Sequence, residues 1–181
     1  MRVALAPVVI LAAVLMMAAP DVAHAQPPLQ RDTWLLSGAL GLALDADASP
    51  SLTFSGAAAF PLTSDLAIEG ELGHVVDNAP GNASVDSSLT TVHATVLYFL
   101  NTSYVLTPYL AAGLGLGKYS VEVGSSDFSQ TEVGFNLGAG VTYPLKRGST
   151  YFRGDFRYFK HIDDVPSVWR FTGGVTVRIG S

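Results

Sequence analysis

Residues 33–44 read TWLLSGALGLAL, and along this stretch the size of the side chain alternates from one position to the next. The even positions, from Trp34 to Leu44, are mainly large and apolar, whereas the odd positions, from Thr33 to Ala43, are mostly small. Successive side chains of a β-strand point to opposite faces. An alternation with a period of two therefore predicts a strand with one bulky apolar face and one small face.

The same period continues to the end of the chain and predicts seven further strands. Prolines and turn-forming residues fall between these strands or at their edges, where a residue without an N–H donor is tolerated. The sequence shows no helical period of useful length and no linker to a second domain. The eight predicted strands are Thr33–Leu44, Ser51–Phe60, Leu66–Val76, Ser88–Leu100, Thr107–Glu122, Gln130–Tyr143, Thr150–Lys160 and Val168–Ile179. Short connections between eight strands favour an up-and-down barrel, which has no free edge.

The charged residues indicate which face of this barrel points inward. In residues 168–179 the odd positions are mainly bulky and apolar, whereas the even positions include Arg170 and Arg178. The strand predicted before it sets Phe152 and Phe156 against three charged side chains in the same way. A small, charged face fits the narrow interior of eight strands, and a bulky apolar face fits lipid. The sequence thus predicts an all-β protein, an eight-stranded antiparallel up-and-down transmembrane β-barrel.

The first 25 residues have the features of a cleaved secretory signal peptide. Arg2 gives a positive start, a mostly apolar stretch follows, and Ala23-His24-Ala25 matches the small-x-small cleavage pattern. We predict cleavage after Ala25, a short periplasmic segment over residues 26–32 and the barrel over residues 33–181. An uncleaved N-terminal membrane anchor is the alternative interpretation of this segment.

Composition excludes several classes of function. Hydrophobic residues make up 49% of the chain and charged residues 14%, against about 25% charged in a typical soluble domain. The absence of cysteine excludes disulfides and thiolate metal sites. A net charge of −5, with only 10 lysines and arginines, argues against nucleic-acid binding. We expect neither a cofactor nor a metal ion.

The predicted inner face carries equal numbers of acidic and basic residues. The acids are Glu69, Glu71, Glu132 and Asp155, and the bases are Arg153, Arg157, Arg170 and Arg178. Charges held in a narrow lumen need partners of opposite sign, because burial of an unpaired charge is costly. We therefore expect a salt-bridge network that plugs the barrel, with His93, Asn136 and Thr142 filling the gaps. A gated path for ions or protons is the alternative.

Aromatic residues collect toward the two ends of the predicted strands, as they do in the aromatic girdles of lipid-exposed barrels. One predicted girdle contains Trp34, Phe60, Tyr98, Tyr109, Tyr143 and Phe152. The other contains Tyr119, Phe128, Tyr158, Phe159 and Trp169. Aromatic residues are common in strands generally, but that preference does not explain their concentration at the ends.

Three segments, residues 104–117, 134–143 and 153–164, resemble a known family. They are similar to the small outer-membrane β-barrels that include the transmembrane domain of outer-membrane protein A and the opacity-type proteins. The resemblance implies a porin-like monomer in the outer membrane of a Gram-negative bacterium. It also implies contact with outer-membrane lipid and lipopolysaccharide, and with periplasmic chaperones and the barrel-assembly machinery during biogenesis. The resemblance implies no particular activity.

Two polar sets lie at the end of the barrel that we expect to face outside, with the termini in the periplasm. His161, Asp163, Asp164 and Ser167 contain the residue types of a nucleophilic triad, but they fall in a predicted turn without an oxyanion element, so we expect no catalytic site. An acidic rim, set against Lys118 and Lys160, is interpreted as solvated loops, and attraction of divalent cations or of a basic partner is the alternative. Its members are Asp45, Asp47, Asp77, Asp86, Glu122, Asp127, Asp163 and Asp164.

We therefore expect a structural outer-membrane barrel with acidic outer loops for surface contacts. A narrow channel, or a binding barrel for small ions or apolar molecules, is the alternative, and a lipid A-modifying enzyme is a third possibility.

Overall fold

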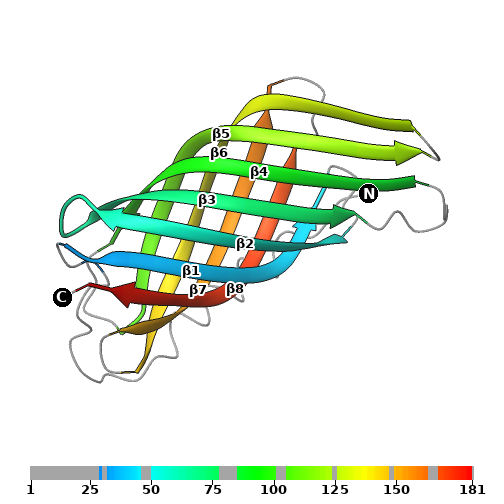
Figure 1. Cartoon of the computed structure of the whole chain (residues 1–181). Helices are drawn as coiled ribbons and strands as arrows, with labels where there is room; N and C mark the ends of the chain where they lie inside the picture. Colours follow the sequence, from blue (N-terminus) through cyan, green and yellow to red (C-terminus); the bar gives the residue numbers. More distant parts are fainter. Residues whose placement is uncertain are drawn as a thin grey trace, which may run out of the picture.

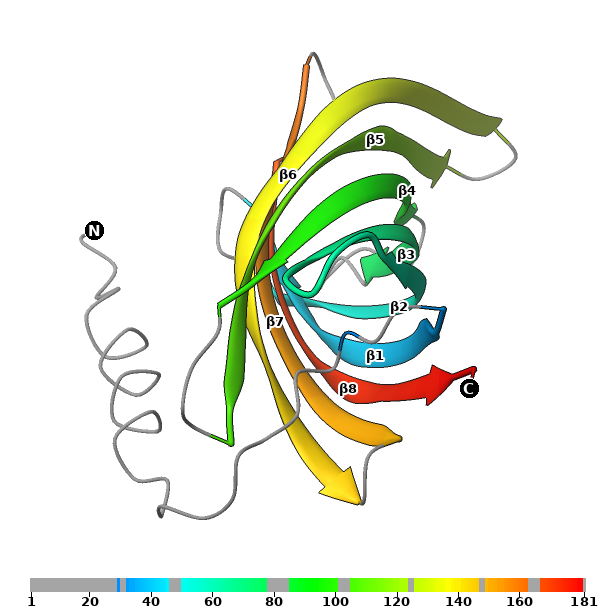
Figure 2. The same ribbon diagram turned by 90° about the vertical axis from the view of Figure 1, so that its left-hand side faces the viewer.

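Eight antiparallel strands close into a barrel in the computed structural model of the chain (Figure 1). Each strand pairs with the next one along the sequence, and β1 pairs with β8 to complete the ring. A view turned by 90° shows the strands curving around a common lumen (Figure 2). The strands are β1 (Trp34–Leu44), β2 (Pro50–Pro61), β3 (Leu66–Asp77), β4 (Val85–Phe99), β5 (Thr107–Val123), β6 (Ser126–Lys146), β7 (Thr150–His161) and β8 (Val168–Ile179). The predicted fold is confirmed.

The structure describes residue 29 and residues 32–45, 50–77, 85–100, 105–123, 126–146, 149–162 and 167–180. The predicted signal peptide, with its cleavage residues Ala23 and Ala25, lies outside the described residues, as does most of the segment 26–32. None of the described residues belongs to a helix with the length and apolarity needed to cross a membrane.

The hairpin of β5 and β6 is longer than the sequence prediction. We predicted a strand over residues 130–143, but β6 begins at Ser126 and ends at Lys146. Its polar start pairs with the end of β5, because a backbone ladder does not depend on alternating apolar side chains. Pro144 also lies within β6 rather than in a connection. A register shift between Pro144 and Lys146 accommodates it, since a bulge tolerates a residue that cannot donate to the ladder.

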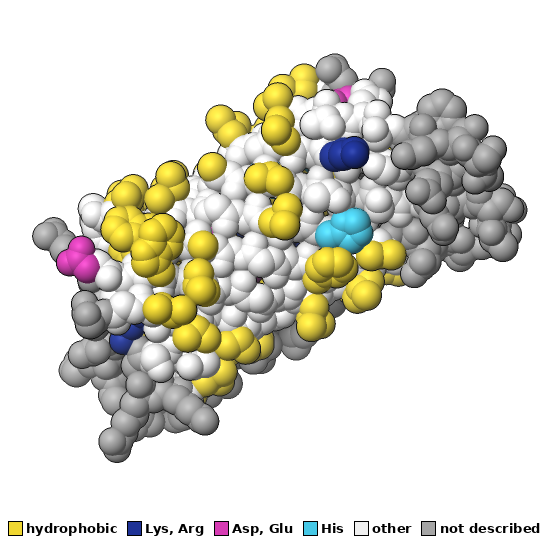
Figure 3. Space-filling model, in the orientation of Figure 1, with side chains coloured by type: hydrophobic (Ala, Val, Ile, Leu, Met, Phe, Trp, Pro, Cys, Tyr) yellow, Lys and Arg dark blue, Asp and Glu magenta, His cyan; other side chains and the backbone are white. Residues whose placement is uncertain are grey.

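The two faces of the barrel differ as the alternation predicts. Outward side chains such as Leu40 and Leu114 are 68% and 67% exposed, whereas the inward side chains of Glu69 and Arg157 are fully buried. Apolar side chains spread over the strand surface in the space-filling view, and the charged side chains on that face lie toward its ends (Figure 3). The bulky face is therefore the outer surface, and the small and charged face lines the lumen.

The strands are strongly staggered around the barrel. Starting from Leu44, at one end of β1, the hydrogen-bonded partner on each neighbouring strand can be followed around the barrel. The path runs from Trp169 on β8 through β7, β6, β5, β4 and β3, and it reaches Phe60 on β2. Phe60 lies beside the partner of Leu35, at the opposite end of β1. We name the end with Leu35 and the C-terminus the terminal end, and the other the far end. This stagger tilts the strands and keeps an eight-stranded lumen narrow enough for side chains to fill.

Candidate functional site

Six charged side chains from three strands meet in the middle of the lumen and form the charge cluster. Strand β3 contributes two acids, β7 one acid and two arginines, and β8 one arginine. In each strand they occupy the alternate positions whose side chains face the lumen, which we call the inward parity of that strand. This places them on the same side of the sheet as neighbouring small residues. The members of the charge cluster are Glu69, Glu71, Arg153, Asp155, Arg157 and Arg170.

Glu69 lies between two arginines of β7. Arg153 Nη1 is 2.5 Å from Glu69 Oε2, and Arg153 Nη2 donates a hydrogen bond to Oε1 at 3.2 Å. Arg157 Nη2 donates to the same Oε1 at 2.7 Å. The Glu69 side chain has no solvent exposure, so its charge is compensated by these guanidinium groups alone among the described residues.

Asp155 holds the same two arginines from the other side. Its Oδ2 accepts hydrogen bonds from Arg153 Nη2 and Arg157 Nη2, both at 3.0 Å, and its Oδ1 lies 2.8 Å from Arg157 Nε. Tyr109 completes the arrangement, because its hydroxyl donates to Asp155 Oδ2 at 2.5 Å and accepts from Arg153 Nε at 2.8 Å. Both arginines thus lie between Glu69 and Asp155, which constrains the positions of their guanidinium groups.

Glu71 and Arg170 form the far side of the charge cluster. Arg170 Nη2 lies 2.5 Å and 2.7 Å from the two carboxylate oxygens of Glu71. Arg157 Nη1 lies 3.7 Å from Glu71 Oε2 and so links this pair to the rest of the charge cluster. The Arg170 guanidinium also lies over the ring of Phe159, 4.4 Å from its centroid. Three acids and three arginines therefore form one connected, electrically balanced group.

Two glycines of β6 make room for these side chains. A Cβ atom at Gly140 would overlap the hydroxyl of Tyr109, and one at Gly138 would lie 2.7 Å from Arg157 Cγ. The lumen next to the charge cluster is nearly filled. A cavity of about 10 Å³ remains there, lined by Ser37, Ala39, Ser55, Ala57, Glu71, Arg153, Asp155 and Thr172.

Apolar side chains cover the charge cluster on both sides within the lumen. Toward the terminal end lie Leu29, Leu35, Ala59, Ala67, Leu97, Phe99, Tyr109 and Ala111. Toward the far end lie Ala43, Leu89 and Val168, with Val75 and Tyr119 packed against them. Our sequence prediction described the inner face as small and charged and did not identify these two apolar layers. The sequence does indicate these layers, because large apolar residues such as Leu35 and Leu97 occupy positions that face the lumen.

Two members of the predicted charge set lie outside the charge cluster. Glu132 is further along β6 toward the far end, where it accepts a hydrogen bond from Gln130 Nε2. Arg178 is near the terminal end, and its guanidinium lies 5.9 Å from the centroid of the Tyr151 ring. The predicted interior salt-bridge network is present, and the ion pairs described above join six of its eight predicted members.

The three residues expected to fill gaps also line the lumen. Asn136 Nδ2 donates to Thr95 Oγ1 at 3.1 Å, and Thr142 Oγ1 donates to the carbonyl oxygen of Thr107 at 3.3 Å. His93 is 2% exposed and packs edge-on against Phe159, with ring centroids 4.9 Å apart.

Comparison with known proteins identifies the family. A model of the family described as the outer membrane protein beta-barrel domain matches residues 9–178. The chain belongs to this family. The protein therefore resides in the bacterial outer membrane, as the sequence resemblance implied. A search of curated proteins gave no significant match.

Solved structures of outer-membrane barrels share the fold. Neisserial surface protein A has a TM-score of 0.65 and 22% identity, over 80% of this chain and 95% of that one. The N-terminal β-barrel domain of OprF from Pseudomonas aeruginosa has a TM-score of 0.63 and 19% identity, over 82% and 98%. Ail, the attachment invasion locus protein of Yersinia pestis, has a TM-score of 0.58 and 15% identity, over 83% and 100%.

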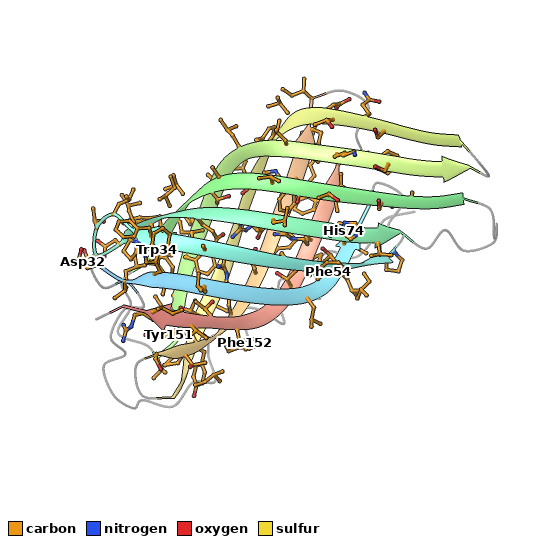
Figure 4. The ribbon with its side chains drawn as sticks, in the orientation of Figure 1. Asp32, Trp34, Phe54, His74, Tyr151 and Phe152 are labelled. Atoms are coloured by element: carbon orange, nitrogen blue, oxygen red, sulfur yellow. The ribbon has the colours of Figure 1, made fainter. Side chains whose placement is uncertain are left out.

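Most predicted girdle residues of this outer-membrane barrel project outward. At the terminal end, Trp34 packs against Phe60 with ring centroids 5.2 Å apart, and Tyr98, Tyr143 and Phe152 are about half exposed. Figure 4 labels Trp34 and Phe152 at this end. At the far end, Tyr158 packs against Trp169 at 4.5 Å.

The girdle prediction was wrong for three aromatic residues. Tyr109 is 1% exposed, and its hydroxyl contacts Asp155 and Arg153 of the charge cluster. Tyr119 packs in the far apolar layer, and Phe159 packs against His93 inside the lumen. All three have the inward parity of their strands, and parity determines the side of a sheet regardless of position along it. The side chain of Phe128, also assigned to a girdle, lies outside the described part of the chain.

His161 lies in a strand, although the polar set that contains it was predicted to form a turn. His161 is the last residue of β7, is 1% exposed and packs against Gly134, where a Cβ would lie 2.7 Å from its Cδ2. Asp163 and Asp164 lie outside the described residues, and Ser167 directly precedes β8. Within the described part of the chain, no three histidine or carboxylate side chains are arranged to hold a metal ion.

The far rim of this outer-membrane barrel is described only in part. Asp45 lines a shallow cavity of about 90 Å³ whose apolar floor is the far apolar layer. The side chains of the other predicted rim acids lie outside the described residues. These are Asp47, Asp77, Asp86, Glu122, Asp127, Asp163 and Asp164.

Proposed function

We propose that the protein is a structural component of the outer membrane with a closed lumen, and that it does not conduct ions. The charge cluster between two apolar layers is the observation that carries this proposal. An ion moving through the lumen would have to cross both apolar layers and displace six mutually paired charges. Such a path is unfavourable, because dehydration of an ion in apolar surroundings is costly.

The size of the lumenal cavity supports the same proposal. The cavity beside the charge cluster has a volume of about 10 Å³, which is close to the smallest volume that holds one water molecule. A conducting pore needs a continuous column of water, and a cavity of this size provides at most one member of it. The alternative of a narrow channel would therefore require the charge cluster to rearrange.

Conductance across a planar bilayer tests this proposal. The mature wild-type barrel is expected to give no current steps above the background of a protein-free bilayer. Arg157→Ala removes the residue that links both halves of the charge cluster, and Arg178→Ala is the matched control outside it. Wild-type steps that change in Arg157→Ala and persist in Arg178→Ala would establish a channel and overturn the structural proposal.

A deletion strain tests the structural role in the cell. Loss of a structural barrel is expected to increase uptake of an apolar fluorescent dye by intact cells, and expression of the wild-type protein restores the barrier. Unchanged uptake together with a missing or altered lipid A species would instead favour a lipid-modifying enzyme.

A further inference from the structure

His93 is a titratable side chain of the lumen that takes no part in the ion pairs of the charge cluster. It projects inward from β4 and is 2% exposed. Neither of its ring nitrogens has a hydrogen-bond partner among the described residues. A histidine in water changes its charge between pH 5 and 8. The lumen therefore encloses a group that responds to pH in the physiological range, with no hydrogen-bond acceptor in place for an added proton.

The two strands that flank β4 hold His93 in place. On β3, Glu71 is its register partner, and both side chains face inward. The Glu71 carboxylate is already engaged, because Arg170 Nη2 lies 2.5 Å and 2.7 Å from its two oxygens. On β5, a Cβ atom at Gly115 would lie 2.5 Å from His93 Cδ2, so the imidazole rests on the backbone of that strand. His93 is thus packed between an acid that pairs elsewhere and a strand that offers it no side chain.

Phe159 of β7 brings His93 next to an arginine of the charge cluster. The rings of His93 and Phe159 meet edge to face, with centroids 4.9 Å apart. The guanidinium group of Arg170 on β8 lies over the same Phe159 ring, 4.4 Å from its centroid. The imidazole and the guanidinium group therefore share one aromatic neighbour, and a charge on one acts on the other.

Charged and titratable side chains of four strands surround His93 within the lumen. They are Glu69 and Glu71 on β3, Glu132 on β6, Asp155, Arg157 and His161 on β7, and Arg170 on β8. Glu71 is the acid directly opposite, and its charge is shared by Arg157 and Arg170. A proton on His93 would add a positive charge to a charge cluster in which three acids and three arginines already balance. A buried surplus charge is costly.

We propose that His93 makes closure of the lumen sensitive to acid, because a protonated His93 is incompatible with the paired charge cluster. In acid, the imidazolium group competes with Arg170 for Glu71, and the surplus charge favours a loosened lumen that admits water. A buried histidine beside a set of paired charges is a recognised form of pH switch. The inference deepens the proposed closed lumen and rests on it: closure holds at neutral pH and weakens in acid.

Proton linkage gives the expected size of the effect. A histidine that is exposed to water by opening of the lumen titrates near pH 6.5. If opening takes up one proton on this histidine, the equilibrium constant for opening rises by up to about 25-fold from pH 7 to pH 5. Local openings of a folded protein are measured by the reactivity of a buried group. The reactivity of a lumenal thiol should therefore rise by the same factor.

A single cysteine measures opening, because the chain has none of its own. Ser55 lines the small cavity beside the charge cluster, together with Glu71, and Ser55→Cys exchanges one atom. The folded barrel in detergent micelles is treated with a dipyridyl disulfide, which modifies thiols in acid as well as at neutral pH. Its rate is divided by that of a free peptide thiol at the same pH. We expect slow modification at pH 7 and modification up to about 25-fold faster at pH 5. A heat-dependent shift in gel mobility establishes that the barrel is folded at both pH values.

Histidine substitutions in the Ser55→Cys background identify the sensor. His93→Phe is expected to abolish the acceleration in acid, and His93→Gln is the second variant should phenylalanine impair folding. The matched control is His74→Phe, because His74 faces outward on β3, beside Phe54 in Figure 4, with its Nδ1 2.9 Å from Thr90 Oγ1. This control is expected to keep the full acceleration. Acceleration that persists in the folded His93 variants, or that is lost in His161→Phe instead, would overturn the inference.

The two pH values also separate this inference from the proposal on which it rests. Slow modification of the Ser55→Cys thiol at both pH 7 and pH 5 would overturn the acid sensitivity and leave the closed lumen standing. Rapid modification already at pH 7 would contradict the closed lumen itself, and the acid sensitivity with it.

Discussion

Glu69 of β3 and Arg157 of β7 form an ion pair in which Glu69 Oε1 lies 2.7 Å from Arg157 Nη2 and neither side chain is exposed to solvent. They are 88 positions apart in the sequence and come together only across the closed barrel. Replacement of a buried ion pair by apolar residues is often tolerated, but removal of one partner leaves the other charge buried and uncompensated. The stability of the barrel therefore depends on the completeness of the charge cluster.

Glu69→Gln is expected to lower the free energy of unfolding by about 3–5 kcal/mol, because Arg153 and Arg157 both lose a buried carboxylate partner. Urea unfolding in lipid vesicles, followed by tryptophan fluorescence, measures this loss. Lys118→Gln is the control, since it removes an outward and exposed charge. A loss below 1 kcal/mol in Glu69→Gln would show that the charge cluster does not stabilise the barrel.

Tyr109→Phe is expected to lower the free energy of unfolding by about 1–3 kcal/mol. The substitution removes the hydroxyl between Arg153 Nε and Asp155 Oδ2 and keeps the ring, which packs against Phe99 at 5.2 Å. Tyr143→Phe is the matched control on the outward face and should change stability by less than about 0.5 kcal/mol. Equal effects of the two substitutions would contradict the inward position of Tyr109.

Gly140→Ala is expected to reduce the yield of folded barrel strongly, because its Cβ would overlap the Tyr109 hydroxyl and lie 2.6 Å from the carbonyl oxygen of Gly154. The comparison is Gly70→Ala, where no atom lies within 4 Å of the added Cβ and the position faces outward. Its folding is expected to match the wild type. The fraction that migrates as folded protein in unboiled gel samples measures both variants, and similar folding of the two would rule out the close approach at Gly140.

His93→Phe is expected to leave the free energy of unfolding unchanged or to raise it by about 1 kcal/mol. Neither ring nitrogen of His93 has a hydrogen-bond partner among the described residues, and the ring already packs against Phe159. Phenylalanine keeps this aromatic contact and removes two buried polar atoms. Denaturant unfolding of the wild type and of His93→Phe under the same conditions measures the difference in the free energy of unfolding. Clear destabilisation would mean that the imidazole nitrogens make hydrogen bonds that stabilise the lumen.

The alternation of residues such as Leu36, Ser37 and Leu40 was enough to predict the strands, their number and the outward face. Tyr109 was misassigned because its position near a strand end was weighed above its parity, which it shares with the inward Ala111. Which acid meets which arginine could not be predicted from the sequence. The pairing of Glu71 with Arg170 depends on the stagger of β3 relative to β8, and a period of two does not determine that stagger.

The position of the charge cluster also bears on the order of events during assembly. Its two acids on β3 precede their arginine partners on β7 and β8 by 84 to 99 positions, so Glu69 and Glu71 remain unmatched until the last strands arrive. An open sheet that lacks the last strands would expose these two carboxylates to hydrocarbon together with its unpaired edges. Ring closure therefore pairs the open edges and neutralises the two carboxylates of β3 at the same time.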